Sequence, residues 1–397
     1  MTPEAMAYLN EALDYIQANS VRRDRVNWPN LRQEVSDLVH DAQKPADTYP
    51  GIELALKHLK DNHSFFLNPE KEQRRLAGIA KRIGLRATYP EGVVIVVFSN
   101  SPAGHAGIRI GDRIAQLNDH PIPTLTRQQF QMLMSEEQVD LVLQPKGQND
   151  LRSIHLQASF YDERRIPEGR LIAERIGYLD LPDLPGNVEH KQLYMAETQK
   201  LLRELDQAGV SSWVLDLRRN SGGNMWPMLA GIGSLLGEGE CLALVSPWEK
   251  VPIFYRDGKA YAEERWEKLA EEVKNPYQLQ RPLPPVAVLT SSQSTGSSGE
   301  FVVLAFRGRP RTRSFGEPTY GLPTGNDLKE LSNGAKIFLT SYWGADRAGN
   351  VFDGPIPPDQ YVKVDWTRFG EEGDPVLQAA LQWLWAEESC QESGLGR

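Results

Sequence analysis

Apolar positions recur at helical spacing over the first 70 residues of the chain. In three stretches the apolar side chains stand three or four positions apart, which places them on one face of a helix. This pattern predicts three amphipathic helices, and polar residues at 60–64 end the third of them. The three apolar stripes are Ala5, Tyr8, Leu9, Leu13 and Ile16, then Leu31, Val35, Leu38 and Val39, and last the apolar positions of residues 52–59.

Beyond about residue 76 the pattern becomes that of strands, and beyond residue 160 strands and helices alternate. Such alternation predicts an α/β unit with a mostly parallel sheet. Residues 237–285 form an insertion of uncertain shape, and residues 387–397 are expected to be disordered. The expected strands are 92–98, 176–181, 213–217, 286–290 and 335–341, and the expected helices are 187–207, 225–236 and 301–306.

Composition narrows the class of protein. The 397 residues suggest two or three domains, and 40% hydrophobic with 24% charged residues is ordinary for a globular protein. A net charge of −9 argues against nucleic acid or an anionic membrane as the main partner. Cys241 and Cys390 are the only cysteines, which excludes a disulfide scaffold and a cysteine-built zinc site. We expect no metal and no organic cofactor.

We expect no targeting or membrane-spanning segment in the sequence as given. Its first residues lack the basic and apolar regions of a signal peptide, and no apolar run approaches the roughly 18 residues of a membrane span. The expected location is therefore the cytoplasm, or the periplasm or exterior if a leader has been removed.

The segment 286–306 carries the strongest chemical signal. A short apolar strand leads through small hydroxyl residues and glycine into an apolar helix that opens at Glu300. A serine at such a turn lies at a helix N-terminus, where unpaired N–H groups and the helix dipole favour negative charge, as acyl transfer requires. The alternative is a structural N-cap, in which Ser297 or Ser298 caps the helix and Glu300 completes a capping box.

A second turn at 215–224 places two glycines after a buried strand. The sequence there is Leu-Asp-Leu-Arg-Arg-Asn-Ser-Gly-Gly-Asn. Glycines at a strand end allow another backbone to approach closely and can direct free N–H groups at an anion. A tight strand-to-helix turn at Gly222 and Gly223 is the structural alternative.

Residues 76–160 resemble a PDZ domain. The resemblance rests on Ser-Pro-Ala-Gly at 101–104, Ala-Gly-Ile at 106–108, Gly-Asp-Arg-Ile at 111–114 and Leu-Asn at 117–118. PDZ domains bind peptide C-termini by adding a strand to a sheet edge, with backbone amides on the carboxylate. The resemblance places the carboxylate-binding loop near residues 82–85.

Taken in order, these motifs resemble the tail-specific proteases, also called C-terminal processing peptidases, over about residues 50–365. The resemblance implies an α/β fold, with a crotonase-like α/β peptidase core, a helical N-terminal region and an inserted PDZ domain. The corresponding divisions are 1–75, 76–160 and 161–390, with a disordered tail at 391–397. The family nucleophile stands three residues before the glutamate of the serine turn, which is Ser297 here. The oxyanion-hole donors implied by the resemblance are the N–H groups of Gly222, Gly223 and Ser298.

The chain departs from the commoner family pattern at the base. That branch places a lysine 25 residues after the serine, where this chain has Leu322, which cannot take a proton. The tricorn-type and nisin-resistance-type branch uses a histidine from the N-terminal region instead, and Asp-Asn-His-Ser-Phe-Phe at 61–66 matches that motif. The resemblance therefore implies His63 as the base, with a pKa near ~6.5 if unperturbed.

A histidine base works better when a third group fixes its tautomer. Tricorn-type members carry an acidic residue before a late glycine, which implies Asp353 here, and Ser64 is the alternative. A turn aspartate before glycine is the structural interpretation of Asp353. Thr324 and Asn326 are expected to line the pocket opposite Ser297.

The resemblance implies a serine endopeptidase that cleaves unfolded or C-terminal peptide segments through an acyl-enzyme, with the PDZ domain docking or gating the substrate. The alternatives are a non-catalytic protein of the same fold that binds hydrophobic ligands, and a peptide-binding scaffold in which only the PDZ domain acts. Assembly into a homo-oligomer is a further expectation.

Overall fold

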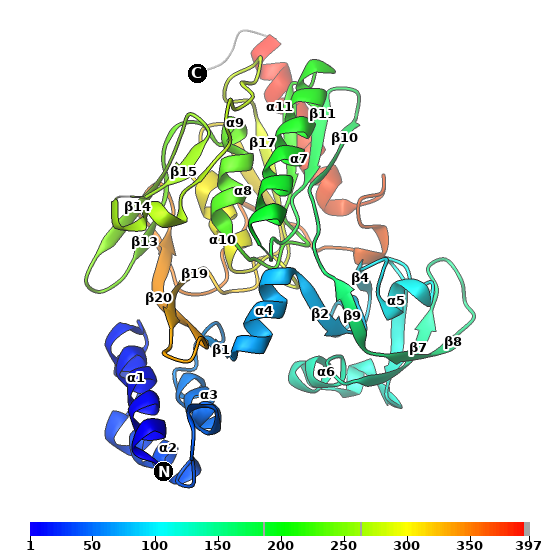
Figure 1. The fold of residues 1–397 in the computed structure, drawn as a ribbon. Helices are drawn as coiled ribbons and strands as arrows, with labels where there is room; N and C mark the ends of the chain where they lie inside the picture. Colours follow the sequence, from blue (N-terminus) through cyan, green and yellow to red (C-terminus); the bar gives the residue numbers. More distant parts are fainter. Residues whose placement is uncertain (186, 263, 393–397) are drawn as a thin grey trace.

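Three helices form the N-terminal end of the molecule, at the lower left of Figure 1. The computed structural model describes residues 1–397 except 186, 263 and 393–397. The helices are α1 (Pro3–Asn19), α2 (Trp28–Leu38) and α3 (Tyr49–His58). Their predicted apolar faces are buried against one another, apart from Leu38, which is exposed.

A short strand joins these helices to the C-terminal part of the chain. β1 (Phe65–Leu67) pairs antiparallel with β20 (Lys336–Ala345), so that Phe66 lies opposite Ile337. Ile337 and Leu339 of β20 complete the core of the helices. α4 (Pro69–Ala77) then leads into the next region.

Residues 79–162, called the PDZ region from here on, form small sheets of their own. Among the described residues their strands pair only with one another. Ile95 of β4 and Phe98, just after it, pack on the neighbouring α/β core in one cluster with Ile176 and Tyr178. The elements are β2 (Ile79–Arg82), β3 (Leu85–Ala87), β4 (Val94–Val97), α5 (Pro102–His105), β5 (Arg113–Leu117), β6 (His120–Pro121), α6 (Arg127–Leu133), β7 (Gln138–Gln144), β8 (Arg152–Gln157) and β9 (Ser159–Asp162). The expected domain boundaries at 76 and 160 stay a prediction. They lie about three residues before the start of β2 and two residues before the end of β9.

The α/β core confirms the predicted fold class. In its six-stranded sheet, of order β10-β11-β12-β17-β18-β22, the strands from β11 onward are parallel and β10 is antiparallel to β11. Side chains of α7, α8 and α10 pack in one apolar cluster with this sheet, and side chains of α11 in another. The strands are β10 (Glu168–Ile172), β11 (Ile176–Asp180), β12 (Ser212–Asp216), β17 (Val286–Thr290), β18 (Thr312–Gly316) and β22 (Gln360–Tyr361), and the helices are α7 (Val188–Gln207), α8 (Met225–Gly231), α10 (Ser298–Phe306) and α11 (Pro375–Glu392).

A second sheet includes the insertion of uncertain shape. Residues 237–285 contribute four strands to an eight-stranded, largely antiparallel sheet together with β1, β19, β20 and β21. This sheet matters for function because β1 and β19 flank the segment that carries His63. The added strands are β13 (Gly239–Val245), β14 (Lys250–Arg256), β15 (Lys259–Tyr261) and β16 (Glu271–Glu272), with β19 (Thr324–Glu330) and β21 (Val351–Phe352).

Two local predictions were wrong. The single helix expected at 225–236 is divided into α8 and α9 (Gly233–Leu236), where two glycines, poor helix formers, flank Ile232. The tail expected to be disordered from 387 continues α11 to Glu392, because Leu377, Leu381 and Leu384 bury one face of that helix. The remaining tail residues, 393–397, lie outside the described residues.

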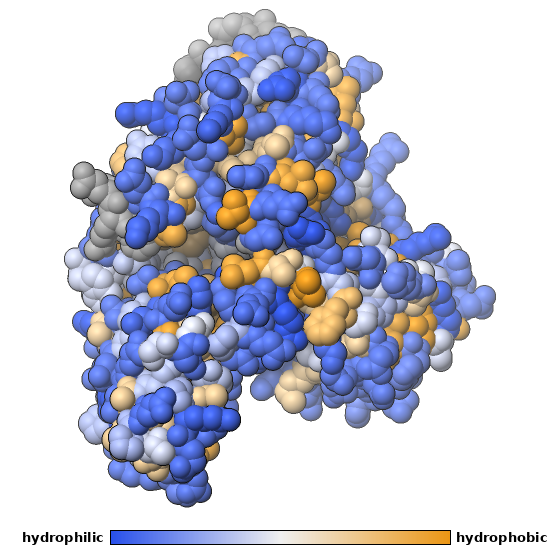
Figure 2. Space-filling view, viewed as in Figure 1, coloured by the Kyte–Doolittle hydropathy of each residue, from blue (hydrophilic) through white to orange (hydrophobic). Residues whose placement is uncertain are grey.

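The surface is mostly hydrophilic. In the space-filling view apolar side chains gather near the middle of the face, over α4 and the lower end of α7 (Figure 2). Leu76, Ile79, Val188 and Leu193 are exposed in these elements and at the start of β2. In the part of the chain that the structure describes, no helix is long and apolar enough to cross a membrane.

Candidate active site

Ser297 occupies the turn between β17 and α10 in a backbone conformation that side chains disfavour. Its φ of 52° and ψ of −119° lie outside the regions that L-residues normally adopt. The carboxylate of Glu300 accepts a hydrogen bond of 2.8 Å from the Ser297 N–H, as in a capping box. The Ser297 hydroxyl itself turns to His63, so the structural N-cap does not use up the serine side chain.

His63 meets Ser297 from the other end of the chain, 234 residues away in sequence. Its Nε2 lies 2.9 Å from Ser297 Oγ, and its Nδ1 lies 2.6 Å from Thr324 Oγ1 on β19. Two arrangements of protons satisfy both contacts, and in the one that suits a base Nδ1–H donates to Thr324 and the hydroxyl of Ser297 donates to Nε2. This tautomer leaves Nε2 free to take a proton from the serine.

The loop that carries His63 is held by the side chains of Asp61 and Asn326. Asp61 accepts hydrogen bonds from the N–H groups of His63 and Ser64, at 3.0 and 2.9 Å, and from the Ser64 hydroxyl. Asn326 on β19 donates to the His63 carbonyl oxygen at 3.0 Å. Thr324 and Asn326 were expected in the pocket opposite Ser297, and in the structure both of them contact His63.

The environment of His63 favours the neutral imidazole. Burial lowers the pKa of His63 to about 4, and the nearby carboxylate of Asp61 opposes this shift only in part. The pKa is thus well below the value of an unperturbed histidine. At neutral pH the ring is uncharged and able to accept a proton.

Two backbone turns meet beside the serine. A Cβ placed on Gly222 would lie 2.7 Å from Ser297 Cβ, and Ser298 Oγ donates to the Gly223 carbonyl oxygen at 2.8 Å. The Gly222 N–H donates to Asn220 Oδ1 at 2.9 Å, so it is not available to an oxyanion. For the N–H groups of Gly223 and Ser298, no acceptor is found among the described residues. Gly223 and Ser298 therefore remain as candidate oxyanion-hole donors, whereas Gly222 does not.

The structure does not bring Asp353 to His63. Its carboxylate forms an ion pair with Arg22, and Arg25 lies 4.0 Å away. Ser64 is also directed elsewhere, because its hydroxyl donates to Asp61 and accepts from the Thr340 N–H. Thr324 occupies the position expected of Asp353. Sequence reasoning placed Thr324 near the site but gave no signal for its contact with Nδ1.

The PDZ region touches both turns of the site. Arg86 on β3 donates to Asp183 at 2.8 and 3.2 Å and to the hydroxyl of Ser221, beside the Gly222–Gly223 turn, at 3.0 Å. Tyr89 and Gln293 exchange two hydrogen bonds, of 3.2 and 3.0 Å, between the PDZ region and the loop before Ser297. A movement of the PDZ region would therefore reach the site directly.

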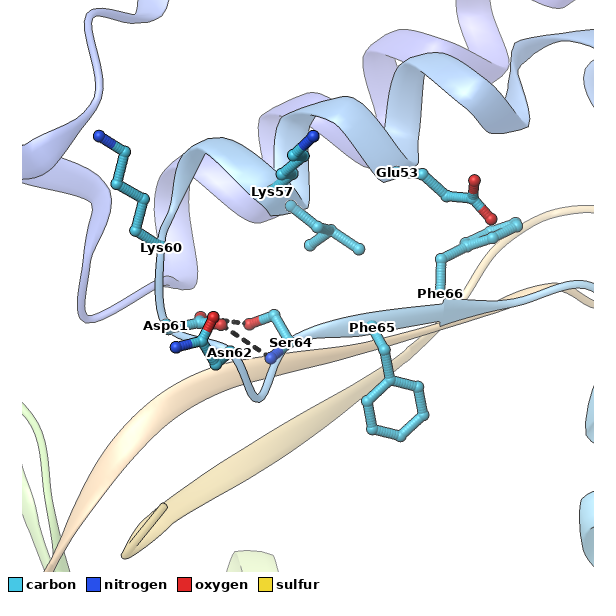
Figure 3. A pocket seen from close by; sticks show the side chains of 9 residues that line it. Glu53, Lys57, Lys60, Asp61, Asn62, Ser64, Phe65 and Phe66 are labelled. Carbon is cyan, nitrogen blue, oxygen red and sulfur yellow. Dashed lines mark hydrogen bonds between the residues drawn. The ribbon is translucent and has the colours of Figure 1, made fainter. Parts of the chain in front are cut away.

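A groove of about 300 Å³ lies behind the loop that carries His63 (Figure 3). It runs between α3 and β1, and Asp61 and Ser64 stand at one end of it. Within the described residues no cluster of His, Cys, Asp and Glu side chains could hold a metal ion.

Comparisons with known proteins relate two regions of the chain to known families. Residues 175–362 match peptidase family S41, and residues 93–145 match the PDZ domain. The nisin-resistance protein of Lactococcus lactis subsp. lactis is 29% identical over 183 residues, which are 46% of this chain and 54% of that protein, so the match spans about half of each. The carboxyl-terminal-processing protease of a Synechocystis species is 24% identical over 96% of this chain and 89% of its own length.

Solved structures share the fold. A lipoprotein from Streptococcus agalactiae superposes with a TM-score of 0.63 at 19% identity, covering 98% of both chains. The photosystem II D1 C-terminal processing protease gives 0.59 at 22% identity, covering 91% of this chain and 94% of its own. The chain is therefore similar to peptidase family S41 over residues 175–362 and to the PDZ domain over residues 93–145, and it shares the fold of these solved structures.

Proposed function

We propose that this protein is a serine endopeptidase in which Ser297 is the nucleophile and His63 the base. The contact of 2.9 Å between His63 Nε2 and Ser297 Oγ carries the proposal. A serine hydroxyl is a poor nucleophile until a neighbour takes its proton, and a neutral imidazole at hydrogen-bonding distance can do so. The loss of the lysine at Leu322 is compatible with this base.

The reaction follows from the positions of these groups. Ser297 Oγ attacks the carbonyl carbon of the scissile peptide bond while His63 Nε2 takes the hydroxyl proton. The carbonyl oxygen becomes an oxyanion, for which the N–H groups of Gly223 and Ser298 are the donors. His63 then gives its proton to the leaving amine, the C–N bond breaks, and an ester on Ser297 remains. A water molecule, activated by the same histidine, hydrolyses that ester and releases the serine.

Thr324 takes the place of an acidic third group in this proposal. Its hydroxyl accepts the Nδ1–H of His63 and so holds the tautomer that leaves Nε2 free. A neutral hydroxyl stabilises the imidazolium less than a carboxylate would, because it lacks the charge. The low pKa of His63 agrees with such a neutral partner.

Substrates are proposed to be unfolded or C-terminal peptide segments that the PDZ region docks or gates. The contacts of Arg86 and Tyr89 with the loops of the site support a role of the PDZ region in catalysis. Binding of a hydrophobic ligand without hydrolysis is set aside, because the serine, the base and two free N–H groups lie together. The cytoplasmic location and a homo-oligomeric state stay predictions.

A fluorophosphonate probe tests the reaction directly. The wild-type protein should be labelled on Ser297, and Ser297→Ala should not be labelled. A peptide with a free C-terminus should be hydrolysed faster than the same peptide with an amidated C-terminus if the PDZ region docks the carboxylate. An intact, folded protein that neither labels nor hydrolyses peptides would refute the peptidase.

A further inference from the structure

Glu300 is completely buried directly behind the nucleophile, and only hydrogen-bond donors face its carboxylate. Oε2 accepts from the N–H groups of Ser297 and Leu322, both at 2.8 Å. Oε1 accepts from the Gly321 N–H at 2.9 Å and from the Thr319 hydroxyl. A capping box needs only the first of these four bonds. The other three join the serine turn to the loop that follows β18.

We propose that the ionised Glu300 is a positioning residue that holds Ser297 in its reactive conformation, and that protonation of Glu300 sets the acid limb of activity. The inference rests on the proposed peptidase function. It assigns the loss of activity on acidification to a group other than the catalytic base.

The strained backbone of Ser297 needs support, and the Glu300 carboxylate provides it. A residue with a side chain at φ 52° and ψ −119° keeps that conformation only when its surroundings impose it. Glu300 Oε2 binds the Ser297 N–H and the Leu322 N–H together, so one oxygen fixes the nucleophile against the facing loop. The direction of the Ser297 side chain toward His63 depends on this backbone.

Protonation would disturb the arrangement, because a protonated carboxyl must donate a hydrogen bond. Three of the four neighbours are backbone N–H groups, which cannot accept one. The fourth, the Thr319 hydroxyl, accepts from the Ile356 N–H at 2.8 Å and could accept from Glu300 only by turning its own proton away from that carboxyl. A neutral carboxyl also binds N–H groups less strongly than a carboxylate does. The hold on Ser297 would weaken as a result.

No charged group counteracts the burial of Glu300. In the described part of the chain its hydrogen-bond partners are all neutral, and it takes part in no ion pair. The ionisable groups of the surrounding loops bond elsewhere: His63 to Ser297, Glu317 to Ser292, and Asp353 to Arg22.

The two titrations should therefore be separable. Burial raises the pKa of Glu300 to about 7, against the four hydrogen bonds, which favour the charged form. The pKa of His63 is lowered to about 4. As the pH falls from 8, Glu300 takes up a proton first, while His63 is still neutral and able to act as a base.

The test is the pH dependence of kcat/KM for peptide hydrolysis between pH 4 and 9. It compares the wild type, Glu300→Gln and the control Glu330→Gln, whose side chain is exposed at the end of β19. The activity of the wild type and the control should fall around a midpoint near pH 7 and level off close to the activity of Glu300→Gln, until His63 takes up a proton at lower pH. Glu300→Gln cannot ionise, so its kcat should be about tenfold or more lower at pH 8, with little change in KM, and constant down to about pH 5. An unchanged acid midpoint in Glu300→Gln would overturn the inference.

Glu300→Asp decides the matter if Glu300→Gln does not fold. The shorter carboxylate keeps the charge in altered surroundings, so the acid midpoint should move by about half a pH unit or more. An identical midpoint in a folded Glu300→Asp would overturn the inference. Labelling of Ser297 at pH 8 separates this result from a failure of the peptidase itself. If Ser297 is labelled at pH 8 but the acid limb of the variant's pH profile is unchanged, only the role of Glu300 is refuted.

Discussion

The two halves of the candidate site are built in opposite ways. The nucleophile side, which consists of Ser297, α10 and the Gly222–Gly223 turn, is packed into the core, and every residue of α10 is buried. The base side, which consists of residues 60–64 and β1, lies at the end of a sheet. β1 has only three residues, and a groove of about 300 Å³ lies behind it (Figure 3).

The difference indicates which half can move. Four hydrogen bonds to Glu300 and the surrounding apolar cluster hold the nucleophile side. On the base side, Lys60 and Asn62 adopt positive φ values of 53° and 56°, which side chains disfavour outside glycine. Asp61 and Asn326 provide the bonds that hold the His63 backbone in place. The loop that carries His63 is therefore the part of the site that can shift most easily.

The largest effect is expected from removal of either reacting side chain. Ser297→Ala and His63→Ala should each lower kcat by about a thousandfold or more, and the double variant should be no worse, because the two groups act as one unit. Leu322→Ala, at the position of the absent lysine, should cost far less. Initial rates on an unstructured peptide give the comparison, with circular dichroism to check folding. A His63→Ala variant near the wild-type rate would show that another base acts.

Truncation of the core on the two sides should have unequal costs. Leu304→Ala, in a fully buried position of α10, should lower the free energy of unfolding by about 2–5 kcal/mol. Phe65→Ala on β1, where the side chain is 38% exposed and stacks on Phe338, should cost only about 1 kcal/mol. Urea unfolding measures both. Equal losses would contradict the contrast in packing.

Loosening the base loop should reduce the rate without unfolding the protein. Asp61→Ala removes the acceptor of the His63 and Ser64 N–H groups, and a displacement of about 1 Å can cost up to about a hundredfold in kcat. Asp61→Asn keeps an acceptor oxygen and should retain most of the activity. Asp24→Ala, in an exposed position, is the control. Steady-state kinetics decides, and full activity in Asp61→Ala would show that the loop is held by other contacts.

The smallest effects distinguish the two candidates for the third group. Thr324→Val removes the acceptor of the His63 Nδ1–H and should lower kcat about tenfold, the worth of one hydrogen bond. Asp353→Asn, which only weakens a partly exposed ion pair with Arg22, should stay within about threefold of the wild type. The reverse order of the two rates would restore Asp353 as the third group.

Local signals in the sequence predicted most of the fold and the turn that carries Ser297. Apolar periodicity identified the helices, and the strand-to-helix turns at 286–306 and 215–224 identified the serine and the glycine turn. The placement of His63 beside Ser297 came from a family resemblance, since no local pattern relates residues so far apart. Its geometry in the structure agrees with the proposed role, which the comparisons do not test.

The partners of these residues were harder to predict, because they depend on strand register. Thr324 reaches His63 through the pairing of β19 with β20, in which Thr324 lies opposite Trp343. Asp353 has the right chemistry for an orienting group, but its neighbours are arginines of the N-terminal helical region. The Gly222 N–H is likewise taken by a side chain, Asn220, two residues before it. These are facts of three-dimensional packing that motif spacing does not contain.

The pairing of β1 with β20 has a consequence for the newly made chain. His63 leaves the ribosome early, but β20, which anchors the strand after it, ends at Ala345. At synthesis rates of about 5–20 residues per second, roughly 15 to 60 s separate the emergence of these two segments. During that interval the base has no complete sheet to dock on, and Ser297 itself emerges only late in the interval. Under the proposed function, a nascent chain would therefore become active only after nearly all of it has been made.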